Sequence, residues 1–188
     1  KLKAHLYTIP EQPNAIPYVT SYYKERWGFC ISQNQFTKLK DGIYHVVVDT
    51  SLTDGVINYG ELLIKGKNSK EIFLSTYICH PSMANNELSG PSVLTFLAKW
   101  LEESRNTEYS YRIIFVPETI GSIIYLSLNY KEMKKKILAG FNISCVGDDR
   151  AYSFIPSRNG NTLSDIVANH VLKWTDANYV KYSWSDRG

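Results

Sequence analysis

The sequence lacks the long apolar runs, the excess of one charge and the cysteine framework that would assign it to a class at once. No apolar run approaches the roughly 18 residues of a membrane helix, so we expect no membrane span. The net charge is only +3, with both signs interspersed, which argues against a nucleic-acid partner. Cys30, Cys79 and Cys145 are an odd number without zinc-type spacing, and Cys79 and Cys145 lie in apolar runs. This pattern favours buried, reduced thiols and a cytoplasmic location.

Motifs for covalent catalysis and for phosphate binding are also missing. Ser89 and Ser122 lie where helices are expected to begin, but neither stands in a Gly-x-Ser-x-Gly elbow. Cys79 and His80 are neighbours on an expected strand, so their side chains point to opposite faces and cannot form a catalytic pair there. The sequence contains no glycine-rich phosphate loop. A covalent nucleophile and a bound nucleotide are therefore both disfavoured.

What the chain does have is enough apolar material for a packed core. Of its 188 residues, 44% are hydrophobic and 21% are charged, which is typical of a globular domain. The length suits one domain, or one domain with a small appendage. The chain starts at Lys1 rather than at Met and stops just after an expected strand, so we interpret it as part of a longer protein.

The first third of the chain differs from the rest and predicts a small β unit over residues 1–66. β-branched residues predict a strand at 43–49 and a returning strand at 56–64. Asp54 and Gly55 between them are a hairpin turn signal. We therefore expect a hairpin here.

Aromatic residues are dense before this hairpin, with Tyr22, Tyr23 and Trp27 among them. One interpretation is a structural cluster that caps the β unit, because aromatic side chains most often serve packing. The other is the wall of a substrate pocket, since tyrosine and tryptophan combine an apolar body with a polar tip. The sequence leaves both open.

Over residues 67–188 the pattern changes to alternating strands and helices. The expected strands are 72–79, 111–116, 137–146 and 179–184, and the expected helices are 90–103, 120–129 and 162–174. Such alternation predicts βαβ units and an α/β fold with a mostly parallel sheet.

Three of these strands are followed by polar groups: His80, Glu118, and the pair Asp148 and Asp149. The carboxyl ends of parallel strands meet at one edge, so we expect these groups to converge. Imidazole and carboxylates suit zinc, and a glutamate outside the metal shell can act as general base. The alternatives are a histidine bonded to loop backbone, a carboxylate favoured by a helix dipole, and an aspartate turn. The combination favours metal-assisted hydrolysis.

Three stretches around these groups, residues 79–90, 116–122 and 147–149, resemble a known group of proteins. These are aminopeptidase-like proteins often associated with bacterial polysaccharide-biosynthesis genes, and they are similar to co-catalytic zinc aminopeptidases and glutamate-carboxypeptidase-like enzymes. The resemblance implies a three-layer α/β/α sandwich of zinc-peptidase type over residues 67–188. It also implies that residues 1–66 are part of a small β-rich insertion domain.

The resemblance further implies roles for single residues. His80 matches the first zinc ligand and Glu118 matches the general base. Asp148 or Asp149 matches a later aspartate ligand, with a register open by one residue. The substrate implied is a peptide or a related amide, and the cofactor is zinc, as one or two ions.

The sequence departs from that pattern at two ligand positions. Asn86 stands where the relatives have the aspartate that bridges two metals, and Glu87 follows it. Thr119 stands where a second glutamate is usual. Glu87 could replace the lost carboxylate, so both Asn86 and Glu87 are candidate metal residues. The hypothesis is a zinc-dependent, aminopeptidase-like hydrolase, and the alternative is a non-catalytic protein of the same fold that binds a peptide or a glycan-linked ligand.

Overall fold

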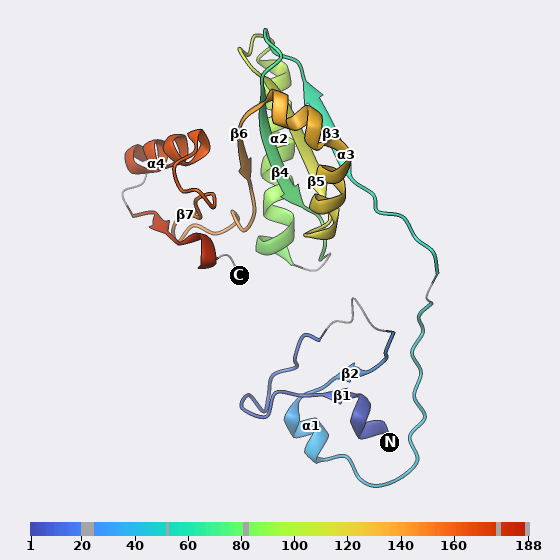
Figure 1. Cartoon of the computed structure of the whole chain (residues 1–188). Helices are drawn as coiled ribbons and strands as arrows, with labels where there is room; N and C mark the ends of the chain where they lie inside the picture. Colours follow the sequence, from blue (N-terminus) through green and yellow to red (C-terminus); the bar gives the residue numbers. More distant parts are fainter. Residues whose placement is uncertain (20–24, 52, 81–82, 176–177, 187–188) are drawn as a thin grey trace. The chain divides into compact units, whose positions relative to one another are not determined.

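The computed structural model divides the chain into two compact units, Lys1–Asp54 and Gly55–Gly188 (Figure 1). The residues it describes are 1–19, 25–51, 53–80, 83–175 and 178–186. The domain boundary predicted between residues 66 and 67 stays a prediction. Each unit is described by itself below.

The first unit is small and holds little regular structure. Its elements are a 3-10 turn η1 (Leu2–His5), β1 (Leu6–Tyr7), β2 (Phe29–Cys30) and α1 (Gln33–Thr37). β1 and β2 pair in parallel. α1 begins with a capping box, in which the Ser32 hydroxyl accepts from the Gln35 amide and the Gln35 side chain accepts from the Ser32 amide. This reciprocal pair of bonds allows a helix of only five residues to form.

The hairpin predicted over residues 43–64 is wrong. Residues 43–50 have no regular structure, and Ile43 and Val47 are exposed. The returning strand exists as β3 (Gly60–Ile64), but it pairs antiparallel with a strand about 50 residues later, with Leu62 opposite Ile113. β-branched content indicates that a segment can extend, and it does not say which partner the segment finds.

The second unit contains the alternating strands and helices that the sequence predicts. After β3 come β4 (Glu71–Tyr77), the π-helical turn η2 (Ala84–Leu88), α2 (Ser89–Glu103), β5 (Ser110–Val116), α3 (Ile120–Lys136), β6 (Ile137–Asn142), β7 (Ser153–Phe154), α4 (Leu163–Thr175), β8 (Val180–Lys181) and the 3-10 turn η3 (Trp184–Asp186). The main sheet has the order β3-β5-β4-β6. β4 pairs in parallel with both β5 and β6, so the predicted α/β class is confirmed.

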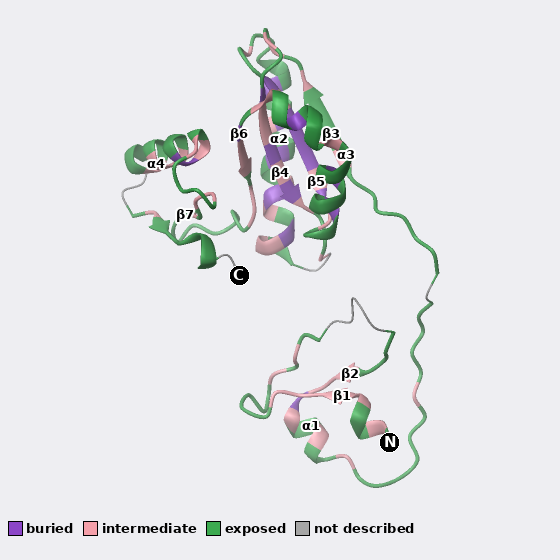
Figure 2. Cartoon of the chain, viewed as in Figure 1, coloured by how far each residue is buried: buried purple, intermediate pink, exposed green. Residues whose placement is uncertain are grey.

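Two clusters of buried side chains lie on the two faces of this sheet. Ile113 belongs to the cluster with Leu94 of α2, and its neighbour Ile114 belongs to the cluster with Tyr125 of α3. Successive strand residues point to opposite faces, so α2 covers one face and α3 the other. Figure 2 shows the buried residues concentrated in β4 and β5 and along the helices beside them. The core therefore holds the central strands, and the position of their ends, in place.

A glycine brings the first residues of α2 close to the sheet. A Cβ atom at Gly90 would clash with the Thr76 hydroxyl and with the Ile143 carbonyl. Only glycine fits this contact, which fixes η2 and α2 against the ends of β4 and β6. Separately, none of the helices in the described part of the chain combines the length and the apolar content needed to cross a membrane.

Candidate functional site

The polar groups predicted at the strand ends follow three neighbouring parallel strands. His80 comes shortly after β4, Glu118 after β5 and Asp148 after β6 (Figure 1). The Glu118 amide lies 2.7 Å from the Cys79 sulfur, which ties the ends of β5 and β4 together. The Gly147 amide donates to the Asn85 side chain at 2.7 Å, which ties the segment after β6 to η2. The edge is thus a connected site.

Glu87 and His80 form the central pair of this edge. Glu87 lies in η2 and its side chain is only 3% exposed. Its Oε2 accepts from the Cys79 amide at 2.7 Å. Its Oε1 is buried without a hydrogen-bond partner among the described residues, and it lies 4.0 Å from His80 Nε2. A buried carboxylate oxygen therefore faces an imidazole that is itself 31% exposed.

The π-helical geometry of η2 explains why Glu87 takes this direction. The amides of Glu87 and Leu88 both donate to the Met83 carbonyl, at 3.1 and 3.3 Å. A π-turn holds one residue more than an α-turn, so it shifts the direction of the side chains that follow. Such turns are frequent at functional sites.

Asn86, beside Glu87, has its recorded contact with the end of β6. Its amide nitrogen donates to the Cys145 sulfur at 3.7 Å, and the Tyr77 hydroxyl lies 3.7 Å from the same sulfur. Burial, with a further contribution from Cys145, raises the pKa of Tyr77 to about 12, so this phenol stays protonated at neutral pH. In this arrangement Asn86 serves a neutral hydrogen-bond network.

Both cysteines of this edge are exposed, so the prediction of buried thiols at Cys79 and Cys145 is wrong. The physical reason is that β4 ends at Tyr77 and β6 ends at Asn142, before either cysteine. Burial, together with the charges of nearby glutamates, raises the pKa of Cys79 in spite of the hydrogen bond from the Glu118 amide. A thiol held protonated in this way is a poor nucleophile.

Asp148 is already engaged by protein groups. Its carboxylate accepts from the backbone and the guanidinium of Arg150, with a closest side-chain distance of 2.9 Å, and from Asn85 at 3.3 Å. Arg150 lowers the pKa of Asp148 below its usual value. Asp149 beside it is exposed. The bond from Asp148 to the backbone two residues later is the turn interaction that the sequence left open.

Glu118 stands before α3, next to a strained residue. Its side chain is exposed. Thr119 has φ 55° and ψ −72°, and the Ile120 amide donates to the Glu118 carbonyl at 2.6 Å. This is a γ-turn with positive φ, which is rare for a β-branched residue. Strain of this kind persists only where the surroundings over-determine the backbone, and it concentrates at functional sites.

The donors at this edge fit zinc in kind. A tetrahedral zinc with ligands at about 2.1 Å separates two ligand atoms by about 3.4 Å, so the 4.0 Å between His80 Nε2 and Glu87 Oε1 needs only a small side-chain adjustment. The orphaned oxygen of Glu87 supplies the ligand that such a site requires. The described residues contain no cluster of three or more histidine, cysteine, aspartate or glutamate side chains disposed for a metal ion.

Asn85 is the site residue that sequence reasoning missed. It donates to Asp148 and accepts from Gly147, so it joins η2 to the segment after β6. The signal available was its place in a polar loop between a strand and a helix, which is where side chains that bond to loop backbone are common.

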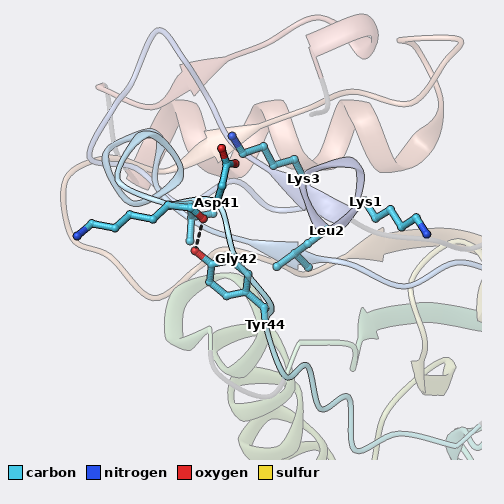
Figure 3. Close-up of a pocket in the computed structure, with 8 residues that line it drawn as sticks. Lys1, Leu2, Lys3, Asp41, Gly42 and Tyr44 are labelled. Carbon is cyan, nitrogen blue, oxygen red and sulfur yellow. Dashed lines mark hydrogen bonds between the residues drawn. The ribbon is translucent and has the colours of Figure 1, made fainter.

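The aromatic wall predicted in the first unit is only partly described. Tyr22 and Tyr23 lie outside the described residues. Trp27 stacks on His5 with ring centroids 3.8 Å apart, and it is 43% exposed. A hollow of about 180 Å³ elsewhere in this unit is lined by Lys1, Leu2, Lys3, Leu39, Lys40, Asp41, Gly42 and Tyr44 (Figure 3). The Tyr44 hydroxyl in it donates to the Lys40 carbonyl, and no predicted site residue lines it.

Comparison with known proteins places these observations in a family. A family model described as a domain of unknown function (DUF4910) matches residues 3–188. A candidate polysaccharide biosynthesis protein with an aminopeptidase-like domain, from Clostridium acetobutylicum, is 46% identical over 179 residues. That match covers 95% of this chain and 41% of the relative, so the chain spans about two fifths of its length. The resemblance inferred from the sequence motifs is confirmed.

Two solved structures are similar to the chain. One is a candidate peptidase from Clostridium acetobutylicum, with 46% identity and a TM-score of 0.86 over 97% of this chain and 43% of that one. The other is a glutaminyl cyclase from an Acidobacteriales bacterium, with 18% identity and a TM-score of 0.55 over 68% of this chain and 51% of that one. The second likeness concerns the fold alone.

Proposed function

We propose that this chain, which belongs to the DUF4910 family, is the core of a metal-dependent, aminopeptidase-like hydrolase that cleaves a peptide or a related amide bond. The names of the similar proteins support the peptidase-like part of this proposal. The helices on both faces of a largely parallel sheet support a three-layer α/β/α fold of the zinc-peptidase type. Zinc is the cofactor we propose, and a cytoplasmic location follows from the sequence argument alone.

The observation that carries the proposal is the orphaned oxygen of Glu87. A buried acceptor left without a partner destabilises a fold by about 1–3 kcal/mol, and by more when the group is charged. Packing gives no reason to keep such a group in a protein interior. A cation held between Glu87 Oε1 and His80 Nε2 would satisfy both atoms at once.

The residues of the site divide into holders and a base. His80 and Glu87 would hold the metal through Nε2 and Oε1. Zinc, when bound, supplies a Lewis acid and lowers the pKa of a water molecule. Glu118 would take the proton from that water and return it to the leaving amine, as a general base and then a general acid. Its exposure at the same edge leaves it open to the substrate.

The alternative is a non-catalytic protein that binds a peptide or a glycan-linked ligand at the same edge. Two observations favour it: Asn86 contacts Cys145, and Asp148 is paired with Arg150. Neither residue is therefore poised to complete a two-metal site, and a single ion held by fewer residues is the form of the enzyme that the structure supports best.

Metal content and hydrolysis of the full-length protein test the proposal together. We expect near-stoichiometric zinc in the wild type and its loss in Glu87→Gln, with turnover lost as well. Glu118→Gln should keep the zinc and lose turnover. Glu102→Gln, at an exposed site on α2, is the matched control and should change neither.

The outcomes separate the two functions. A protein that binds no zinc under saturating conditions overturns the metal-dependent proposal. Zinc bound without hydrolysis of any amide tested favours the non-catalytic alternative. Zinc retained at wild-type affinity in Glu87→Gln removes Glu87 from the site.

A further inference from the structure

The apolar side of α4 faces outward. Its apolar residues recur at helical spacing and form one stripe, and every member of the stripe is exposed: Leu163, Ile166, Val167, Val171 and Trp174. Ile166 is 60% exposed and Trp174 is 75% exposed. An amphipathic helix of a finished domain buries this stripe. In α4 the buried residue is Asp165 instead.

Hydrogen bonds fix α4 in this orientation. Asp165 accepts from the amide and hydroxyl of Ser157 at 2.6 Å each, and from the amide and hydroxyl of Thr162 at 2.8 and 2.7 Å. The Ser164 hydroxyl accepts from the Gly140 amide of β6 at 2.9 Å. The polar side of the helix is thereby bound to its own loop and to the main sheet. Turning the apolar stripe inward would break these bonds.

The strands that flank α4 form an incomplete sheet. β7, α4 and β8 make a βαβ unit, because β7 and β8 pair in parallel with Ser153 opposite Val180 and Phe154 opposite Lys181. Each strand has two residues. Parallel sheets are normally covered on both faces, and a two-stranded pair is marginal alone. This unit lacks the further strands and the cover that its topology calls for among the described residues.

The length of the relatives indicates what supplies them. The matched region is only 41% of the similar Clostridium acetobutylicum protein and 43% of the chain in the solved structure. Similar full-length proteins thus carry more than half of their residues outside this region. Those residues are covalently joined to it, so their effective concentration at α4 exceeds that of any separate partner.

We infer that the exposed stripe of α4 is the docking surface for a further sheet segment of the same polypeptide, in the part of the longer protein outside these 188 residues. That segment would extend the β7–β8 pair and present an apolar face to Ile166, Val171 and Trp174. The βαβ unit is then the joint between the core described above and the rest of the protein. The inference does not depend on the proposed chemistry at the other strand ends.

Hydrogen exchange of the full-length protein tests this inference directly. We expect the amides of residues 163–175 to exchange slowly, at a rate independent of protein concentration. Ile166→Gln should speed this exchange and lower the midpoint of thermal unfolding. Lys173→Gln, an exposed polar position on the same helix, is the matched control and should change neither.

Other results would overturn the inference. Rapid exchange in the wild type would show that nothing covers the stripe. Protection that appears only at high concentration, together with a dimer in sedimentation, would assign the stripe to a second copy of the chain. Equal effects of Ile166→Gln and Lys173→Gln would show that position 166 is no more covered than position 173.

Discussion

Two glutamates near the opposite ends of β4 share the same degree of burial and differ in what surrounds them. Glu71, the first residue of β4, is 1% exposed, and Glu87, shortly after its end, is 3% exposed. Both oxygens of Glu71 accept from the Arg112 guanidinium, at 2.6 and 3.1 Å, and Lys136 lies 3.7 Å away. Glu87 has one satisfied oxygen and one orphaned oxygen. Equal burial therefore marks a structural charge at one edge and a candidate functional charge at the other.

The backbone of the two edges differs in the same sense. Thr119 and Cys145, which follow β5 and β6 at the carboxyl edge, have φ of 55° and 52° without being glycine. Within the described residues the other such position is Arg105, after α2. Strained backbone and an unsatisfied charge occur together at the carboxyl edge, as expected where a site is kept at the expense of stability.

Arg112→Leu is the change that should disturb the amino edge most. It leaves Glu71 buried without its bidentate partner, and breaking a buried ion pair in this way destabilises a protein by about 3–5 kcal/mol. The hydrogen bonds to Glu71 raise the already high pKa of Arg112, so the pair is charged at any pH of interest. The free energy of unfolding of the full-length protein, from denaturant titration, measures the effect.

Arg158→Leu is the control for this change, because Arg158 is exposed. A loss in Arg112→Leu no larger than in Arg158→Leu would show that the network at Glu71 contributes nothing, and the contrast between the two edges would fail.

Asp165 offers a third buried acid, satisfied by hydrogen bonds rather than by a cation. Burial alone would raise its pKa, but the bonds from Ser157 and Thr162 lower it to about 2 from 3.8. Because the pKa is lower in the folded state, its contribution of about 2 kcal/mol is present above about pH 4 and is lost as the pH falls toward 2. Asp165→Asn should remove this contribution at pH 7 and flatten the fall in stability between pH 4 and 2. Unfolding measured at several pH values would contradict the prediction if both proteins gave parallel curves.

Thr119→Gly should stabilise the protein slightly, which is unusual for a substitution at a strand end. Glycine adopts positive φ without the strain of a β-branched residue, worth about 1 kcal/mol, less the entropy that glycine loses on folding. Thr50→Gly, at an exposed position with ordinary φ, is the control and should not stabilise. A loss of stability in Thr119→Gly would mean that the threonine side chain, and not the backbone, shapes this turn. Denaturant titration of both variants decides.

The sequence carried the strand ends well and the single residues within the site poorly. The runs before His80, Glu118 and Asp148 became neighbouring parallel strands because apolar, β-branched segments separated by helices have few other ways to pack. The hairpin failed because β3 found a partner about 50 residues away, and no local pattern encodes such a choice. α3 extends to Lys136, so the lysine-rich run is helical, where the sequence placed the end of the helix at residue 129.

The choice between Asn86 and Glu87 lay beyond sequence reasoning for a physical reason. One residue of difference in an α-helix turns a side chain by about 100°. The π-turn of η2 inserts one residue, which brings the Glu87 carboxylate to His80 while the Asn86 amide contacts Cys145. Periodicity detects a helix start, and it does not detect which kind of turn begins it.

Glu87→Gln should have the smallest effect on stability and the most to say about the contrast between the edges. Glutamine keeps the shape and an oxygen for the Cys79 amide, and it removes a buried charge that lacks a partner. We expect the free energy of unfolding of the metal-free protein to stay within about 0.5 kcal/mol or to rise. Glu71→Gln is the matched change at the other edge, and it should destabilise because it weakens both bonds to Arg112. If the two variants lost equal stability, Glu87 would be as structural as Glu71, and its orphaned oxygen would no longer point to a ligand.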